Sequence, residues 1–166
     1  LVMAGGAMAQ STGSADGTAN ANVIAPITIK AMNTLEFGNV VSTAGTVSVA
    51  SDTGDRTNSV PALSPGANQQ GLVRAGTFDM AGEGTSTYAI TLPSNAVTLS
   101  DGAGVPNTMT VNAFTVAAGT TGSVTGTVGT LAAGAGVLNV GATLNVAALQ
   151  APGSYTGTYA VTVAYN

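Results

Sequence analysis

Two pairs of acidic residues lie close enough in the chain to share chemistry. Asp52 and Asp55 flank Thr53-Gly54 in a polar stretch, and Ca²⁺ takes oxygen ligands from carboxylates in such loops. Asp79 and Glu83 flank a Met-Ala-Gly turn, and paired carboxylates can hydrolyse a glycosidic bond when they are held at a fixed separation. A Ca²⁺ site needs about six oxygens, and no third acid lies near the first pair. We therefore interpret both pairs as solvated turn residues and expect no metal site and no cofactor.

The side chains that most enzymes use are missing. The chain has no cysteine and no histidine, which removes the usual general base, the Ser-His and Cys-His nucleophile pairs and the commonest zinc ligands. The glycines at Gly102-Ala103-Gly104 and Gly134-Ala135-Gly136 lack the spacing and the lysine of a phosphate-binding loop. We therefore expect no catalytic residue and predict that this protein is not an enzyme.

Aromatic side chains offer one further kind of site. A sugar ring could stack on a platform of tyrosines. The four tyrosines are Tyr88, Tyr155, Tyr159 and Tyr165. All four fall on strand-period positions and the chain has no tryptophan, so packing in the core and at sheet edges is the favoured interpretation.

The composition limits the partners. Among 166 residues, the size of one domain, only three are cationic and seven acidic, so charged residues make up 6% where about 25% is usual. Lys30, Arg56 and Arg74 are scattered singly and the net charge is −4, so no basic stripe exists and nucleic-acid binding is excluded. The surface must be built from Thr, Ser, Asn and Gly, and its contacts should respond little to salt.

The N-terminal residues resemble the end of a secretory signal. Leu1 to Gln10 form an apolar run ending in Ala-x-Ala, which predicts export with cleavage after Ala9. The alternative is that this run is retained as an apolar arm that is held against something. No apolar stretch reaches the 18 or more residues of a membrane-spanning helix. We predict an N-terminal extension over residues 1–21 and a single domain over residues 22–166.

Alternation of apolar and polar residues dominates the rest of the chain. It begins at Ala19, runs to Ala31 with a break near Pro26, and predicts a strand. The same period recurs in the segments 35–41, 46–50, 72–80, 87–92, 108–116, 123–131, 137–146 and 155–165. Turn residues separate these segments, and residues 51–71 are predicted to form a surface loop. Short strands at this spacing predict an all-β sandwich of two antiparallel sheets.

The end of the chain carries the most informative pattern. Residues 153–165 read Gly-Ser-Tyr-Thr-Gly-Thr-Tyr-Ala-Val-Thr-Val-Ala-Tyr, which is similar to the final strand of chaperone-usher pilins and of the spore coat protein U family. The segment Leu35-Glu36-Phe37-Gly38 is similar to the Leu-x-Phe-Gly segment after their first strand. Further segments resemble a related family of uncharacterised secreted β-sandwich proteins: Thr77-Phe78, 88–93, 109–111 and 140–144. The likeness spans about Val23 to Asn166, although many of those pilins carry a disulfide beside the first strand and this chain has no cysteine.

The resemblance implies an incomplete immunoglobulin-like (pilin-like) sandwich. The last strand would be supplied by the N-terminal extension of the next subunit, by donor-strand exchange. A missing strand leaves an open sheet edge and an uncovered core, which a donated segment repairs with main-chain hydrogen bonds and with alternate side chains that fill pockets. The part of this chain expected to lie next to the acceptor groove is the final strand, with Tyr155, Tyr159, Val161, Val163 and Tyr165.

The donor is expected upstream of the first strand, and two segments compete. If the N-terminal run is retained, the pocket-filling residues are Leu1, Met3, Ala7 and Ala9. If cleavage after Ala9 occurs, the donor face is Ala19, Ala21, Val23, Ala25, Ile27 and Ile29, and the domain's own first strand begins later. A third interpretation makes the N-terminal run a signal remnant with no role.

These expectations lead to a structural role outside the cell. The leading prediction is a secreted subunit of an extracellular filament (pilus or fimbria) or of a surface coat, a homopolymer whose partners are copies of itself. The resemblance adds a periplasmic chaperone and an outer-membrane usher as partners. The alternative prediction is a self-complemented β-sandwich adhesin that binds a carbohydrate or a host surface ligand.

Overall fold

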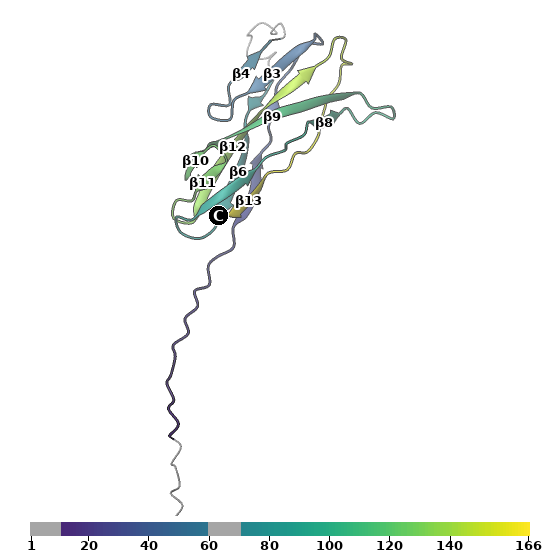
Figure 1. Cartoon of the computed structure of the whole chain (residues 1–166). Coiled ribbons are helices and arrows are strands. Elements are labelled where there is room, and N and C mark those ends of the chain that lie inside the picture. Colours follow the sequence, from purple (N-terminus) through teal and green to yellow (C-terminus); the bar gives the residue numbers. More distant parts are fainter. Residues whose placement is uncertain (1–10, 60–70) are drawn as a thin grey trace, which may run out of the picture.

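The computed structural model describes residues 11–59 and 71–166, and this part of the chain is all β. No helix occurs in these ranges, and therefore none that is long and apolar enough to cross a membrane. Abundant glycine, threonine and valine oppose helix and favour strands. An elongated body of strands ends in an extended arm (Figure 1), which we define as residues 11–24.

Antiparallel pairing joins all the strands of the described ranges. In chain order they are β1 Thr28–Asn33, β2 Glu36–Phe37, β3 Gly45–Val49, β4 Arg56–Asn58, β5 Val73–Arg74, β6 Gly76–Ala81, β7 Thr87–Thr91, β8 Val97–Ser100, β9 Thr108–Ala118, β10 Ser123–Thr125, β11 Val128–Thr130, β12 Ala135–Val146 and β13 Thr162–Tyr165.

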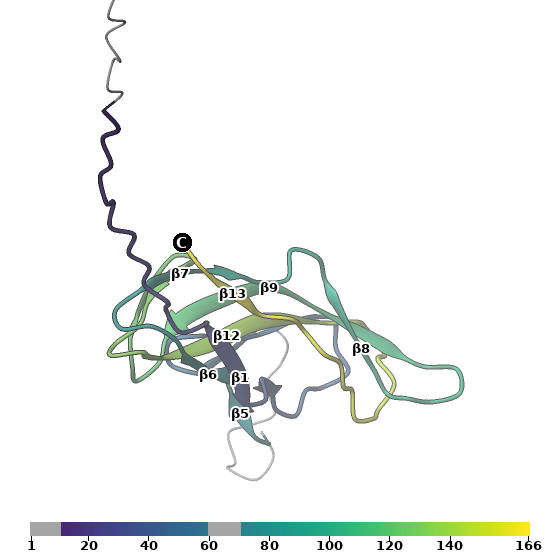
Figure 2. The ribbon, with the colours of Figure 1, turned by 90° about the horizontal axis from the view of Figure 1, so that it is seen from below.

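Two sheets make up most of the body. The larger, seven-stranded sheet runs β1-β6-β12-β3-β4, with β9 on the other edge of β12 and β8 beyond β9. The smaller sheet runs β10-β11-β7-β13, and β2 pairs with β5 as a separate ribbon. The edge strands β1 and β13 contact each other where the arm leaves the body, close to the C-terminus (Figure 2).

The core is divided into two clusters. The arm-end cluster joins both sheets: Met80 and Leu138 from the larger sheet face Tyr88 and Ile90 from the smaller one, with Leu131 beside them. The far-end cluster comes from the larger sheet alone: Val47, Met109, Val111, Ala142, Leu144 and Val146. The smaller sheet therefore covers the half of the larger sheet that lies nearer the arm, and the other half needs another cover.

A bulge in β9 turns the side chain of Phe114 toward the core in the far half of the body. Two residues of β9, Ala113 and Phe114, lie opposite the single residue Ala142 of β12, and Ala113 has a φ of 49°. The extra residue shifts the alternation, so that Val111 and Phe114 both point to the core side. Without the bulge, Phe114 would face solvent.

Several predicted strand limits are corrected by the structure. The predicted strand over residues 19–31 is wrong for residues 19–27, because no strand pairs with them and β1 begins at Thr28. The predicted strand over residues 35–41 is limited to β2. The predicted loop over residues 51–71 contains β4, and its residues 60–70 lie outside the described residues. The 123–131 strand is a hairpin of β10 and β11, and β8 was not predicted. In the final segment only β13 is a strand, since residues 157–161 find no ladder partner.

Candidate functional site: an open groove between two irregular segments

An open groove of about 710 Å³ lies over the far half of the larger sheet. Its first wall is the segment 34–42, which follows β1, and its second wall is the segment 150–159, which precedes β13. Large apolar side chains form the floor: Leu99, Met109, Val111, Phe114, Leu144 and Val146. Apart from β2 the two walls are irregular. This part of the core is therefore covered by wall side chains such as Phe37 and Tyr155, and the smaller sheet does not reach it.

Two arginines brace the first wall. Arg74 on β5 donates from Nε to the Thr34 carbonyl oxygen (3.1 Å), from Nη2 to Thr34 Oγ1 (2.9 Å) and from Nη1 to Asn33 Oδ1 (3.3 Å). Arg56 on β4 donates from Nη1 to the carbonyl oxygen of Asn39 (2.8 Å), and partial burial lowers its pKa. Two of the three cationic residues of the chain therefore form hydrogen bonds to the first wall.

The second wall is held along its length by backbone and side-chain bonds. Ser100 at the end of β8 and Thr156 exchange both backbone hydrogen bonds, at 2.8 and 2.9 Å. Gln150 donates to the hydroxyl of Tyr155 (2.8 Å), and that hydroxyl donates to the carbonyl oxygen of Ala151 (2.7 Å). At the end farthest from the arm the walls meet, because Ser42 Oγ donates to the Gln150 carbonyl oxygen (2.7 Å).

Tyr159 lies at the other end of the groove, in an aromatic group. Its ring centroid is 5.3 Å from that of Phe114 and 6.0 Å from that of Phe78, the latter edge to face. Burial raises the pKa of Tyr159 to about 12. The Tyr159 ring therefore packs with neighbouring aromatic rings, and the Tyr155 hydroxyl is already hydrogen-bonded within the second wall.

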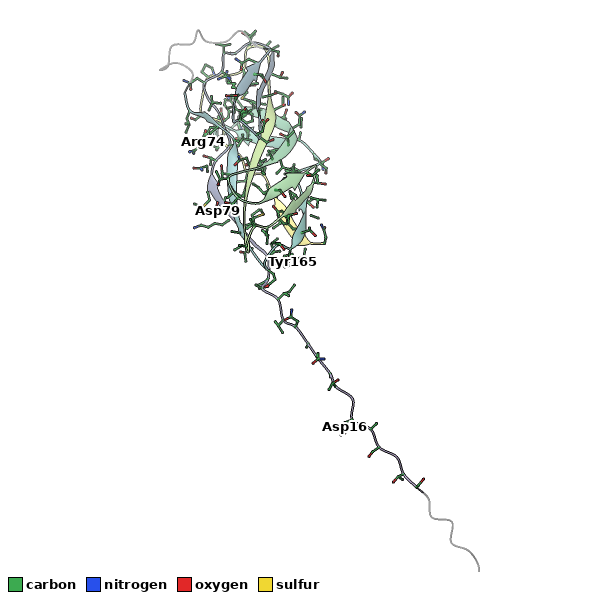
Figure 3. The ribbon with its side chains drawn as sticks, turned by 90° about the vertical axis from the view of Figure 1, so that its left-hand side faces the viewer. Asp16, Arg74, Asp79 and Tyr165 are labelled. Atoms are coloured by element: carbon green, nitrogen blue, oxygen red, sulfur yellow. The ribbon has the colours of Figure 1, made fainter. Side chains whose placement is uncertain are left out.

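The arm leaves from the end of the body opposite the far end of the groove. Tyr165, the last residue of β13, donates its hydroxyl to the carbonyl oxygen of Ala25 (3.0 Å) and accepts the N–H of Glu83 (2.6 Å). Glu83 Oε2 accepts the N–H of Ala25 (3.0 Å). Figure 3 shows Tyr165 where the arm begins and Asp16 far out along it. The base of the arm is thus fixed, while the arm itself is exposed throughout.

The structure separates the predicted donor residues into two groups. Ala19, Ala21 and Val23 lie on the exposed arm, with Val23 93% exposed. Ile27 and Ile29 pack against the arm-end cluster of their own domain, so they are not free to fill a neighbour's pockets while β1 is formed. Ala25 is held at the base of the arm, as described above. The predicted donors Leu1, Met3, Ala7 and Ala9 lie outside the described residues.

The predicted final-strand residues are divided in the same way. Tyr155 and Tyr159 line the groove. Val161, Val163 and Tyr165 pack against the arm-end cluster instead, because β13 pairs with β7 in the smaller sheet. Only the first part of the predicted segment therefore lies at the groove.

The acidic pairs do not form a common site. Asp52 Oδ1 accepts the N–H of its neighbour Thr53 (2.9 Å), and the Asp55 N–H binds Thr53 Oγ1 (3.1 Å), as in a polar turn. Asp79 lies exposed on β6 opposite Lys30, whereas Glu83 holds the arm. Within the described residues, no group of three acidic side chains gathers as a metal site would require.

Sequence reasoning missed the residues that shape the groove. Arg56 and Arg74 were predicted only as scattered charges, and the first wall was predicted as a strand. A signal was present in β9, where apolar residues shift from the odd positions Met109 and Val111 to the even positions Phe114 and Val116. Such a break in period indicates a bulge.

Comparisons with known proteins identify a family without a described activity. No curated protein and no solved structure matches the chain. Residues 27–165 match the family model described as Domain of unknown function (DUF4402), from just before β1 to the end of β13. Because this match covers most of the chain and both sheets, the protein belongs to the DUF4402 family.

Proposed function

We propose that this protein is a structural subunit of an extracellular filament or surface coat, which polymerises when the arm of one copy fills the groove of the next. The observation that carries the proposal is the groove over the half of the core that the smaller sheet does not cover, together with an unpartnered arm at the opposite end of the body. The body would then be an incomplete immunoglobulin-like sandwich, as in pilins. The proposal includes export from the cell and delivery by a chaperone and an usher.

The groove has the properties that an added strand needs. Its floor is apolar, so each buried side chain the size of valine or leucine contributes about 1.5–3 kcal/mol before association costs are subtracted. At the arm-side end of the second wall, residues 157–159 have no ladder partner, so an inserted strand can pair with their backbone. Such a contact combines non-polar burial with main-chain hydrogen bonds, and it depends little on charge.

The positions of arm and groove favour an open chain of subunits. The contact joins two different surfaces of the protein, and a heterologous contact that does not close into a ring produces a filament. An inserted strand antiparallel to the second wall would run away from the acceptor's own arm. The donor's body would then lie beyond the far end of the acceptor, and copies would stack head to tail.

The donor must come from the residues before Ala25, because Ile27 and Ile29 belong to the donor's own core. Two candidates fit this limit: the N-terminal run with Leu1, Met3, Ala7 and Ala9, and the arm face with Ala19, Ala21 and Val23. Mass spectrometry of the mature N-terminus separates them, since cleavage after Ala9 removes the first.

Electron microscopy of the purified protein in negative stain tests the proposal. Filaments are expected from the full chain, and deletion of residues 1–22 should abolish them. Added peptides with the sequence of residues 1–9 or 11–24 should raise the unfolding temperature of the deleted protein, because a ligand that binds only the folded state stabilises it. Scrambled peptides are the control. Filaments that survive the deletion would refute donation by the arm, and a strictly monomeric protein that binds a glycan array would favour the adhesin.

A further inference from the structure

Leu149 is an unusual residue at the far end of the groove. It lies in the loop after β12, has a φ of 57° and is 91% exposed. A left-handed backbone is uncommon for a bulky side chain, and full exposure of a leucine gives up its hydrophobic contribution. Such a combination suggests that this side chain is displayed for a contact that the single subunit does not make.

The neighbouring residue explains how Leu149 is held in this position. Gln150 is fixed by the bond from Ser42 to its carbonyl oxygen, and its side chain also donates to the Thr108 carbonyl oxygen (3.2 Å). Both bonds fasten the loop to the rim of the groove. Leu149 is therefore kept out of the core while the residue next to it lines the groove.

Apolar residues are also exposed at the opposite end of the body. Val23 is 93% and Ile24 51% exposed, directly before the Ala25 that Glu83 and Tyr165 hold. In the filament proposed above, the arm enters the acceptor with its C-terminal end at the far end of the groove. The two exposed residues of the donor would then lie at the rim beside Leu149 of the acceptor.

We propose that Leu149 of one copy packs against Val23 and Ile24 of the next, a contact between the two bodies outside the groove itself. This inference rests on the proposed function and adds two features to it. It selects the arm segment ending at Asn22 as the donor, because a donor over residues 1–9 would leave residues 10–24 as a tether between the bodies. It also makes the joint between subunits stiff, since the link before the fixed Ala25 is only two residues long.

The small side chains of the arm agree with this choice. Ala19 and Ala21 would point into a groove whose floor already carries Leu99, Met109 and Phe114. Small donors suit a floor of large side chains, because the close packing of protein interiors leaves little room for more volume.

Disulfide cross-linking between copies tests the contact, and the absence of native cysteines makes the experiment clean. The full chain carrying Val23→Cys and Leu149→Cys is assembled under reducing conditions, oxidised, boiled in detergent and run on a non-reducing gel. A ladder of covalent multimers that collapses on reduction is expected. Val23→Cys with Thr125→Cys, an exposed position on β10 at the side of the body, is the matched control and should give no ladder.

A second variant measures the stiffness of the joint. Leu149→Gly removes the side chain and suits the left-handed backbone, so the subunit should remain folded while the persistence length of the filaments in micrographs falls at least twofold. Ala113→Gly is the control, because Ala113 has a similar φ of 49° but lies in the β9 bulge, away from both ends.

The outcomes distinguish this inference from the proposed function. A ladder confined to the Val23–Leu149 pair, with more flexible Leu149→Gly filaments, supports both. Filaments without the ladder overturn the contact and leave donor-strand exchange standing, with the donor farther from Ala25. If the unmodified chain forms no polymer, both are wrong.

Discussion

Gly141 lies at the point where β12 changes neighbours. One edge of β12 pairs with β6 as far as Val140 and with β3 from Ala142. The backbone that follows β3 crosses directly over Gly141. A Cβ at this position would lie 2.6 Å from the backbone nitrogen of Ser51 and 2.9 Å from the carbonyl carbon of Ala50. Only glycine therefore lets the two backbones approach so closely.

Gly141→Ala should lower the free energy of unfolding by about 1–3 kcal/mol, because overpacking forces the backbone to shift. Denaturant unfolding of the purified protein measures the change. Gly104→Ala is the control, since a Cβ there meets nothing within 4 Å, and its effect should be close to zero. Equal effects at the two positions would show that the crossing above Gly141 is not tight.

Tyr159 makes the stability of the body sensitive to alkali. Burial raises its pKa to about 12, above the ordinary value of 10.0, so the folded state favours the neutral phenol. The stabilisation is complete below about pH 10 and is lost as the pH rises from about 10 to 12, because the unfolded chain ionises first. Phenylalanine does not ionise. In Tyr159→Phe, the denaturant midpoints of unfolding at about pH 9 and at about pH 11 should therefore differ less than in the unmodified protein. An unchanged alkaline loss would assign it to another group, such as Tyr88, whose pKa burial also raises.

At the scale of elements, the first wall owes its shape to side chains from neighbouring ribbons. Arg74→Gln removes the guanidinium that holds Asn33 and Thr34, where β1 ends and the first wall begins. Loss of these charge-assisted bonds should cost about 1–2 kcal/mol and speed amide hydrogen exchange in residues 34–40. Lys30→Gln, on the exposed face of β1, removes the same charge and should leave that exchange unchanged. Equal exchange in both variants would mean that backbone pairing with β5 suffices.

The strands also show what the alternation of apolar and polar residues predicts and what it does not. Strands of the larger sheet, such as β9 and β12, lie within a few residues of their predicted limits because their period of two reflects one buried face. The same alternation continues through residues 19–27, which remain outside both sheets. Alternation fits any strand with one apolar face, and it does not say whether the pairing partner is in the same chain.

For the whole molecule, the scarcity of charge gives a direct prediction for the polymer. With only three cationic and seven acidic residues, few contacts between copies can be ion pairs. Filaments should therefore persist at about 1 M NaCl, where charges farther apart than about 3 Å are screened. Micrographs and sedimentation before and after the addition of salt measure this. Dissociation by salt would show that the few charged residues hold the copies together.

The sequence by itself determined the fold class and the kinds of chemistry that its side chains can supply. Alternation and turn residues are local properties, and an inventory without cysteine or histidine limits chemistry whatever the fold. Only the tertiary structure decided where the groove lies. The smaller sheet covers half of the larger one, arginines from β4 and β5 brace the first wall, and Tyr165 with Glu83 fixes the base of the arm. These contacts join residues far apart in the chain, and no local pattern records such distances.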